Sequence, residues 1–205
     1  MEKLILFSAM NEAKRKGLVV IHGGCGIIGA MDAAREQECR GALAESANAA
    51  MRQLSSGGSA LAAVVEAVKV LEDCPQVGTY ILFNYIQFNC GKGSVFTRDG
   101  TNEMDAGVMD GYTGAVGGVS TLTNVKNPIC AAHCVLKHSV HSLLCGPGAE
   151  KFAAAHGCVT EAREYFFTQH RYHTICCVLQ SCCVIEHMTS FDRHKNRKQI
   201  YTRGD

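Results

Sequence analysis

Two amphipathic helical segments follow one another directly in this sequence, and strand-like segments lie on both sides of the pair. The first covers about residues 35–54, where apolar residues recur at helical spacing. The second begins after a serine- and glycine-rich break, with Ser59 placed to cap its first turn and Pro75 just beyond its end. Because strands and helices do not alternate one by one, we expect a layered α+β fold rather than a parallel sheet of βαβ units.

The strand-like segments end at glycine-containing turns. Residues 18–21 form a continuous apolar run, and Ser94 begins a short strand that leads into an Asp-Gly hairpin turn. Residues 103–109 alternate between two faces, and residues 114–122 are so rich in small side chains that another layer can approach the backbone closely. We expect a helix from residue 127, a short strand over 141–145 and a short helix over 148–156.

The composition fits one folded domain and excludes several classes of partner. The chain has 205 residues, of which 47% are hydrophobic, and 20 Lys+Arg balance 19 Asp+Glu. A net charge of +1 gives no reason to expect nucleic acid or an anionic membrane as a partner. Twelve cysteines occur without a recognisable secretory signal or membrane span, so we expect a cytoplasmic chain whose cysteines are mostly reduced, buried side chains.

The character of the sequence changes after about residue 175. Residues 1–175 are expected to form the domain, and residues 176–205, which end in a basic stretch without periodicity, are expected to be a divergent, disordered tail. Paired cysteines at 176–177 and 182–183, with His170, His173 and His187 nearby, raise a zinc site as one hypothesis. Adjacent cysteines, however, do not have the C-x-x-C spacing of common tetrahedral zinc sites.

Seven segments of the chain carry a resemblance to one known family. They are, in order, residues 18–26, 65–75, 88–96, 103–111, 114–119, 126–129 and 148–153. The most specific is Glu-Met-Asp-Ala-Gly-Val-Met-Asp-Gly at 103–111. Together they resemble the plant-type L-asparaginases and isoaspartyl peptidases, which are N-terminal-nucleophile hydrolases. The resemblance covers about residues 18–172 and corresponds to most of that family's α subunit.

The resemblance implies a fold and a reaction. The family has a four-layer αββα sandwich, and this chain would supply an incomplete part of it, the α-subunit side. Its members cut themselves before a Thr in a Gly-Thr-Val-Gly motif, and the freed Thr attacks the side-chain amide of L-asparagine or a β-aspartyl dipeptide, with its own amine as the base. A β-subunit-like chain or a homodimer is the implied partner, and asparagine or a β-aspartyl dipeptide is the implied substrate.

The nucleophile motif itself is missing from this sequence. The Gly-Thr pairs are Gly78-Thr79 and Gly100-Thr101, and neither continues as Val-Gly. No catalytic residue is therefore assigned, and we expect the chain to be inactive alone. A non-catalytic paralogue, or a binding or regulatory chain of the same fold, is the alternative.

Some residues are implied to lie near the reacting centre of the family. They are His22, Gly23, Gly24, Asn89, Gly91 and Gly93. Each also has a structural explanation, because a strand end and a tight turn need glycine dihedrals and an Asn side chain on their own account.

The family also holds a structural sodium ion on the backbone carbonyls of a loop. Here that loop corresponds to Leu71, Glu72 and Cys74, and residues 76–87 form an insertion that enlarges it. No other cofactor is implied. The paired carboxylates Asp105 and Asp110 are expected to serve the strand and turn on which they lie rather than to act as an acid–base pair.

Overall fold

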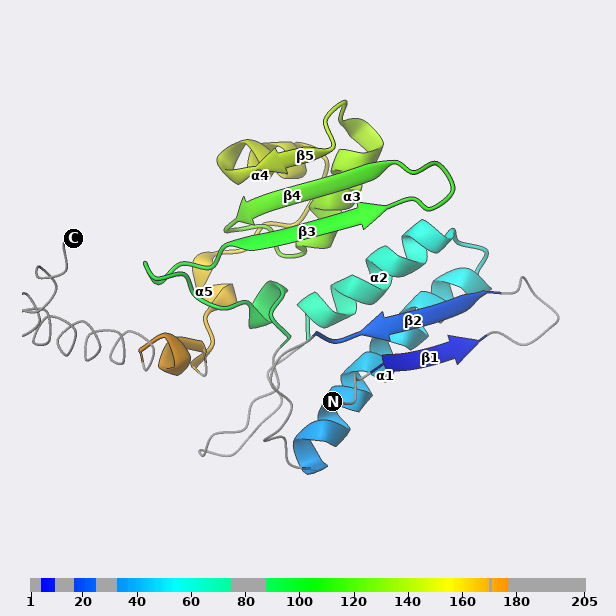
Figure 1. Cartoon of the computed structure of the whole chain (residues 1–205). Helices are drawn as coiled ribbons and strands as arrows, with labels where there is room; N and C mark the ends of the chain where they lie inside the picture. Colours follow the sequence, from blue (N-terminus) through cyan, green and yellow to red (C-terminus); the bar gives the residue numbers. More distant parts are fainter. Residues whose placement is uncertain (1–4, 10–16, 25–32, 75–87, 170, 177–205) are drawn as a thin grey trace, which may run out of the picture.

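The computed structural model describes residues 5–9, 17–24, 33–74, 88–169 and 171–176, and two sheets and their helices make up this part of the chain (Figure 1). The first sheet is an antiparallel pair, β1 (Ile5–Ala9) and β2 (Leu18–His22), in which Ile5 lies opposite His22. Val19 and Ile21 of β2 are buried against the helices, whereas Leu18 and Val20 alternate with them and are exposed. Successive side chains of β2 are alternately buried and exposed, as expected for a strand that is covered on one face.

The predicted helix pair is present as α1 (Ala33–Ser55) and α2 (Ala60–Glu72), which pack against each other, and α1 also packs against β1 and β2 (Figure 1). The Ser59 side chain accepts a hydrogen bond from the Ala62 N–H at 3.1 Å and caps α2 as expected. Alanines fill much of the contact between the helices, and the buried Ser46 hydroxyl donates to the Ala67 carbonyl at 2.8 Å. Small side chains therefore allow the two helix backbones to approach closely.

The second sheet has the order β3-β4-β5. Antiparallel β3 (Met104–Met109) and β4 (Val116–Leu122) are followed by β5 (Leu143–Cys145), which runs parallel to β4. Helices α3 (Pro128–His138) and α4 (Gly146–Ala155) pack on the sheet, and α5 (Arg163–Phe166) and a 3-10 turn η1 (Gly91–Gly93) lie at its edge.

A close approach of backbones joins this sheet to α3. A Cβ built on Gly117 would lie 2.6 Å from Leu136 Cβ, so no other residue fits at this position without displacing the helix. Around it, aliphatic residues of the sheet, of α3 and of the loop between them form the main core: Val108, Val119, Leu122, Val125, Ile129 and Val135. The small-residue strand predicted from the sequence is thus the strand on which a helix packs most closely.

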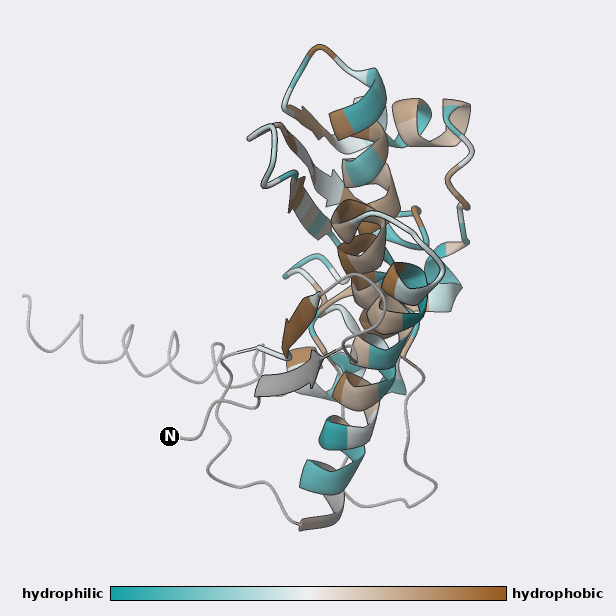
Figure 2. Cartoon of the chain, turned by 90° about the vertical axis from the view of Figure 1, so that its right-hand side faces the viewer, coloured by the Kyte–Doolittle hydropathy of each residue, from teal (hydrophilic) through white to brown (hydrophobic). Residues whose placement is uncertain are grey.

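The strands and the helices lie on opposite sides of the molecule (Figure 2). The outer face of the strand layer is uncovered among the described residues and exposes several large apolar side chains: Leu18, Val20, Met109, Val116 and Leu143. Within the described segments, no helix has the combination of length and apolar character needed to cross a membrane. The α+β class is confirmed.

Most predicted elements are confirmed, and one is wrong. The strand expected from Ser94 is reduced to an isolated bridge between Phe96 and Asn102, because the hairpin turn follows too soon for a ladder to form. The turn itself is confirmed, with Gly100 at a φ of +75°. The insertion at 76–87, Thr79, most of the tail over 176–205, and the cysteines and histidines at 182, 183, 170 and 187 lie outside the described residues.

Candidate functional site

Three segments singled out in the sequence come together at the end of β2 and α2. At the first contact, Gly23 lies against Phe88, which directly precedes Asn89. A Cβ on Gly23 would lie 2.8 Å from Phe88 Cε1 and 3.2 Å from Leu43 Cδ2. The absence of a side chain at residue 23 is therefore what lets the strand end meet the segment from 88 to 93.

The second contact joins that segment to the end of α2. Gly91 has a φ of +50°, in the left-handed region, and is buried against Glu72. A Cβ at this position would lie 2.7 Å from Glu72 Cα. Both the backbone conformation and the lack of space require glycine here.

Asn89 and Gly93 lie in the turn that the Gly23 and Gly91 contacts fix in place, and each accepts a hydrogen bond. The Asn89 side-chain oxygen accepts a hydrogen bond from the Val95 N–H at 2.9 Å, and the Gly93 carbonyl accepts one from Arg171 Nε at 2.9 Å. Asn102 donates from its side chain to the carbonyls of Ser94 and Val95, at 3.1 and 3.2 Å. The Asn89 side chain thus has a structural role in this turn, as the sequence predicted.

His22 and Gly24 face the open side of the strand layer. The burial pattern of β2 places the exposed His22 on the same side as Leu18 and Val20. Gly24 follows with a φ of +119°, which only glycine adopts readily. The predicted site residues at this strand end therefore border the surface that nothing in the described chain covers.

Glu72 links α2 to the first turn of α3. The residue is only 2% exposed, and its Oε1 accepts a hydrogen bond from the Ile129 N–H at 3.0 Å. Burial is the largest effect on this carboxyl and raises its pKa to about 7, although the Ile129 and Asn127 hydrogen bonds oppose the rise. The carboxylate thus satisfies an N–H at the start of a helix whose own cap residue, Asn127, makes no side-chain capping bond.

Asp73 extends this junction toward the surface. It accepts a hydrogen bond from Asn127 Nδ2 at 2.9 Å and forms an ion pair with Lys126 Nζ at 3.3 Å. The Lys126 side chain also lies over the Tyr165 ring, 6.0 Å from its centroid. One aspartate therefore connects the end of α2 with the loop before α3 and with α5.

Two residues of the predicted sodium loop, Leu71 and Glu72, make other contacts within the described chain. The Leu71 carbonyl accepts the Cys74 N–H at 3.4 Å, and the Glu72 side chain is directed to α3. No group of three His, Cys, Asp or Glu side chains in the described segments is arranged to hold a metal ion. Sodium binding remains a prediction from the resemblance.

Nucleophilic side chains near these contacts are poorly suited to attack an amide. Burial raises the pKa of Cys90 to about 12, so its thiol is protonated at neutral pH. Thr101 lies in the hairpin turn, where its hydroxyl is 2.8 Å from that of Thr97. Among the described residues, the hydrogen-bond partner of the Thr101 hydroxyl is thus another hydroxyl and not the base that an activated nucleophile needs.

The expected structural roles of the two aspartates are confirmed. Asp105 accepts hydrogen bonds from the Ser120 hydroxyl at 2.7 Å and from the Thr121 N–H at 2.8 Å, which supports Thr121 at a φ of 55°. Asp110 accepts from the Tyr112 N–H at 3.0 Å and from the Thr113 hydroxyl at 2.8 Å. The Tyr112 bond is the largest cause of the lowered pKa of Asp110.

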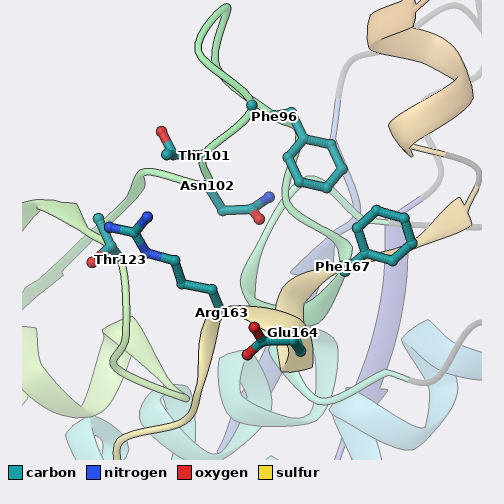
Figure 3. A pocket seen from close by; sticks show the side chains of 8 residues that line it. Phe96, Thr101, Asn102, Thr123, Arg163, Glu164 and Phe167 are labelled. Carbon is teal, nitrogen blue, oxygen red and sulfur yellow. The ribbon is translucent and has the colours of Figure 1, made fainter.

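A cavity of about 270 Å³ lies away from these segments, between the hairpin turn and α5 (Figure 3). Phe96 and Phe167 form one side, with ring centroids 5.8 Å apart. The Arg163 side chain extends toward Thr123 in Figure 3, and Glu164 lies at the same end of the cavity. No local pattern in the sequence predicts this cavity, because its lining comes from the hairpin turn, Thr123 and α5, which are far apart in the chain.

The chain is an α+β scaffold with a junction at the end of β2 that depends on glycines. Comparison with known proteins agrees with this description: the family model described as Asparaginase matches residues 15–199. The chain belongs to this asparaginase family. The resemblance that the ordered segments suggested is therefore confirmed.

Individual relatives show how much of the family this chain represents. It is 41% identical over 162 residues to an isoaspartyl peptidase of Salmonella typhimurium, which is 78% of this chain and 48% of that protein. It is 43% identical over 143 residues to a plant-type L-asparaginase of Pyrococcus furiosus, 68% of this chain and 41% of the relative. An isoaspartyl peptidase/L-asparaginase of Rattus norvegicus is 38% identical over 152 residues, 74% and 42% of the two chains. The chain thus spans less than half the length of these relatives.

Proposed function

We propose that this chain is the scaffold part of an asparaginase or isoaspartyl peptidase, which hydrolyses the side-chain amide of L-asparagine or the β-aspartyl bond of a dipeptide once a second part supplies the nucleophile. The observation that supports it most directly is the convergence of the three segments around Gly23 and Gly91. Their residues match family segments, and they meet at the edge of an uncovered strand face.

The uncovered face supports the need for a second part. An apolar strand surface in water loses the burial that would stabilise it, roughly 1.5–3 kcal/mol for each large side chain. A second sheet packed on Leu18, Val20 and Met109 would bury this surface and complete a four-layer αββα sandwich. The second part would also bring the Thr that attacks the amide, because neither Cys90 nor Thr101 is suited to that role.

In this proposal the described residues hold the catalytic groups in place and do not themselves react with the substrate. The Gly23–Phe88 contact sets where the strand end and Asn89 lie, and the Gly91–Glu72 contact fixes the turn that follows. Small displacements of a catalytic group lower rates severely, because reacting atoms must be held near their attack distance. The glycines would therefore influence turnover without touching the reacting atoms.

The test is reconstitution. The chain is mixed with the part of the Salmonella typhimurium isoaspartyl peptidase that this chain does not match, and aspartate release from L-asparagine and a β-aspartyl dipeptide is measured. Release by the mixture, and none by either part alone or with the partner's Thr replaced by Ala, is the expected result. Gly23→Ala should reduce release, whereas Gly41→Ala, on an open face of α1, should leave it unchanged.

The alternative is a non-catalytic chain of the same fold. It would be favoured if the chain alone is folded by circular dichroism and soluble, while every mixture fails to release aspartate above a buffer blank. Turnover by the unaccompanied chain would instead refute the proposal that the nucleophile comes from elsewhere.

A further inference from the structure

Two cysteines far apart in the sequence meet on the helical side of the molecule. The sulfur atoms of Cys134, on α3, and Cys158, just after α4, are 3.8 Å apart. Both side chains are partly exposed, and Cys158 packs against the main core. We propose that Cys134 and Cys158 are a modification site, which forms a reversible disulfide when the folded chain meets a low-molecular-weight disulfide such as oxidised glutathione.

The backbone on both sides of the contact is held by the fold. Cys134 lies within α3, and the Cys158 N–H donates to the Ala153 carbonyl at 3.0 Å. The next residues are tied to the segment before α3, because the Lys126 N–H donates to the Val159 carbonyl at 2.9 Å and Val125 forms a bridge with Thr160. The two thiols are therefore neighbours because of tertiary packing, and disulfide formation must bring their sulfur atoms from 3.8 Å to about 2.05 Å.

The surroundings favour a disulfide over a metal site. Cys130 lies one helical turn before Cys134 and is close enough to both members of the pair to influence them electrostatically. Even so, the described residues contain no cluster of three His, Cys, Asp or Glu side chains with the arrangement of a metal site. The pair in sulfur–sulfur contact is Cys134 with Cys158, and Cys130 serves as a nearby reference thiol.

The reaction is a thiol–disulfide exchange in two steps. One cysteine, as its thiolate, attacks a sulfur of oxidised glutathione, which forms a mixed disulfide and releases one glutathione. The second cysteine then attacks the protein sulfur and releases the other glutathione. Two protein thiols thereby lose two protons and two electrons, and these reduce one glutathione disulfide to two thiols.

Burial controls the rate of this exchange. It is the largest cause of the pKa of Cys158 rising to about 12, so little of this thiol is ionised at neutral pH. The exchange should therefore be slow near pH 7 and faster as the pH rises. The disulfide, once formed, would tie the end of α4 to α3 across 24 residues and lower the unfolding equilibrium constant by on the order of 100-fold.

The experiment incubates the folded full chain with defined mixtures of reduced and oxidised glutathione at pH 8, blocks remaining thiols by alkylation and maps the peptides by mass spectrometry. A linked peptide containing Cys134 and Cys158 is expected, together with a higher urea midpoint. Cys130→Ser should retain both results. Cys134→Ala and Cys158→Ala, which keep the site apolar, should lose both while circular dichroism stays unchanged.

Two outcomes would overturn the proposal. One is recovery of Cys134 and Cys158 fully alkylated from the folded chain under conditions where the urea-unfolded chain forms disulfides. The other is a Cys134 or Cys158 linked mainly to Cys130, which would show that sulfur contact in the fold does not select the pair. If an Ala variant loses its circular dichroism signal, it is set aside. The peptide maps of the wild-type chain and of Cys130→Ser then test the proposal.

Discussion

Glu72 is a carboxyl side chain at the junction of two helices. Its burial disfavours the ionised form, whereas its hydrogen bonds favour that form. Its Oε1 accepts the Ile129 N–H, while Oε2 has no hydrogen-bond partner among the described residues. Burial disfavours the ionised form of the carboxyl and is the largest cause of its pKa rising to about 7, which the hydrogen bonds to the carboxylate only partly offset. The residue therefore makes the stability of the folded chain depend on pH near neutrality.

The sign of this dependence follows from the raised pKa. The folded state binds the proton more tightly than an unfolded carboxyl, whose pKa is near 4.5, so the stabilisation is complete below about pH 4.5 and is lost as the pH rises through about 7. The loss is on the order of 3 kcal/mol if the full shift is expressed. We expect Glu72→Gln to flatten the fall in the free energy of unfolding between pH 5 and 8, as measured by urea denaturation in sodium-free buffer.

Glu66 offers a matched control for this prediction. It lies on the same helix, pairs with Lys69 at 3.0 Å and is 36% exposed. Glu66→Gln leaves Glu72 in place and should therefore retain the wild-type pH slope. An unchanged slope in Glu72→Gln would mean that this carboxyl does not titrate as its burial implies.

The helix pair α1–α2 shows what a single cap contributes to an element. The helices are separated by a short turn in which Gly57 has a φ of +88°, and α2 begins at once with Ser59 as its N-cap. The capping bond replaces water at an N–H that the helix itself cannot satisfy. Since α2 also carries Glu72 at its other end, the position of this helix sets the junction with α3.

Removing the cap should weaken α2 measurably. Ser59→Ala is expected to lower the free energy of unfolding by about 1 kcal/mol, because the Ala62 N–H loses its side-chain acceptor. Ser55→Ala, at the exposed end of α1, provides the control and should change stability by less than about 0.5 kcal/mol. Equal losses in urea denaturation of the two variants would argue against the capping role.

At the scale of the whole molecule, the strand layer is covered on its inner side by helices and open on its outer side (Figure 2). Val20, Met109 and Val116 are 51%, 61% and 46% exposed on that outer side. Open apolar strand surfaces of this kind promote association between molecules. Association of the isolated chain is therefore an expected property of its architecture.

Polar substitutions on the outer face should reduce this association. Combining Val20→Thr with Met109→Lys is expected to lower the sedimentation-average mass at high protein concentration and to leave the circular dichroism spectrum intact. The buried neighbour Val19 provides the contrast, since Val19→Thr should destabilise the fold. The prediction fails if the double variant associates as strongly as the wild-type chain. In the reconstitution experiment, the same double variant should bind the second part less well.

The sequence by itself determined the elements that depend on local chemistry. The helix spacing over 35–54, the Ser59 cap, the Asp-Gly turn and the alternation over 103–109 each reflect contacts within a few residues, and the structure confirms them. The ordered motifs also identified the family. What only the tertiary structure decided depends on segments far apart in the chain: Gly23 against Phe88, Glu72 on α3 and Cys134 beside Cys158. Packing creates these neighbours, because burial and close approach arise only when the layers meet, and no local pattern records them.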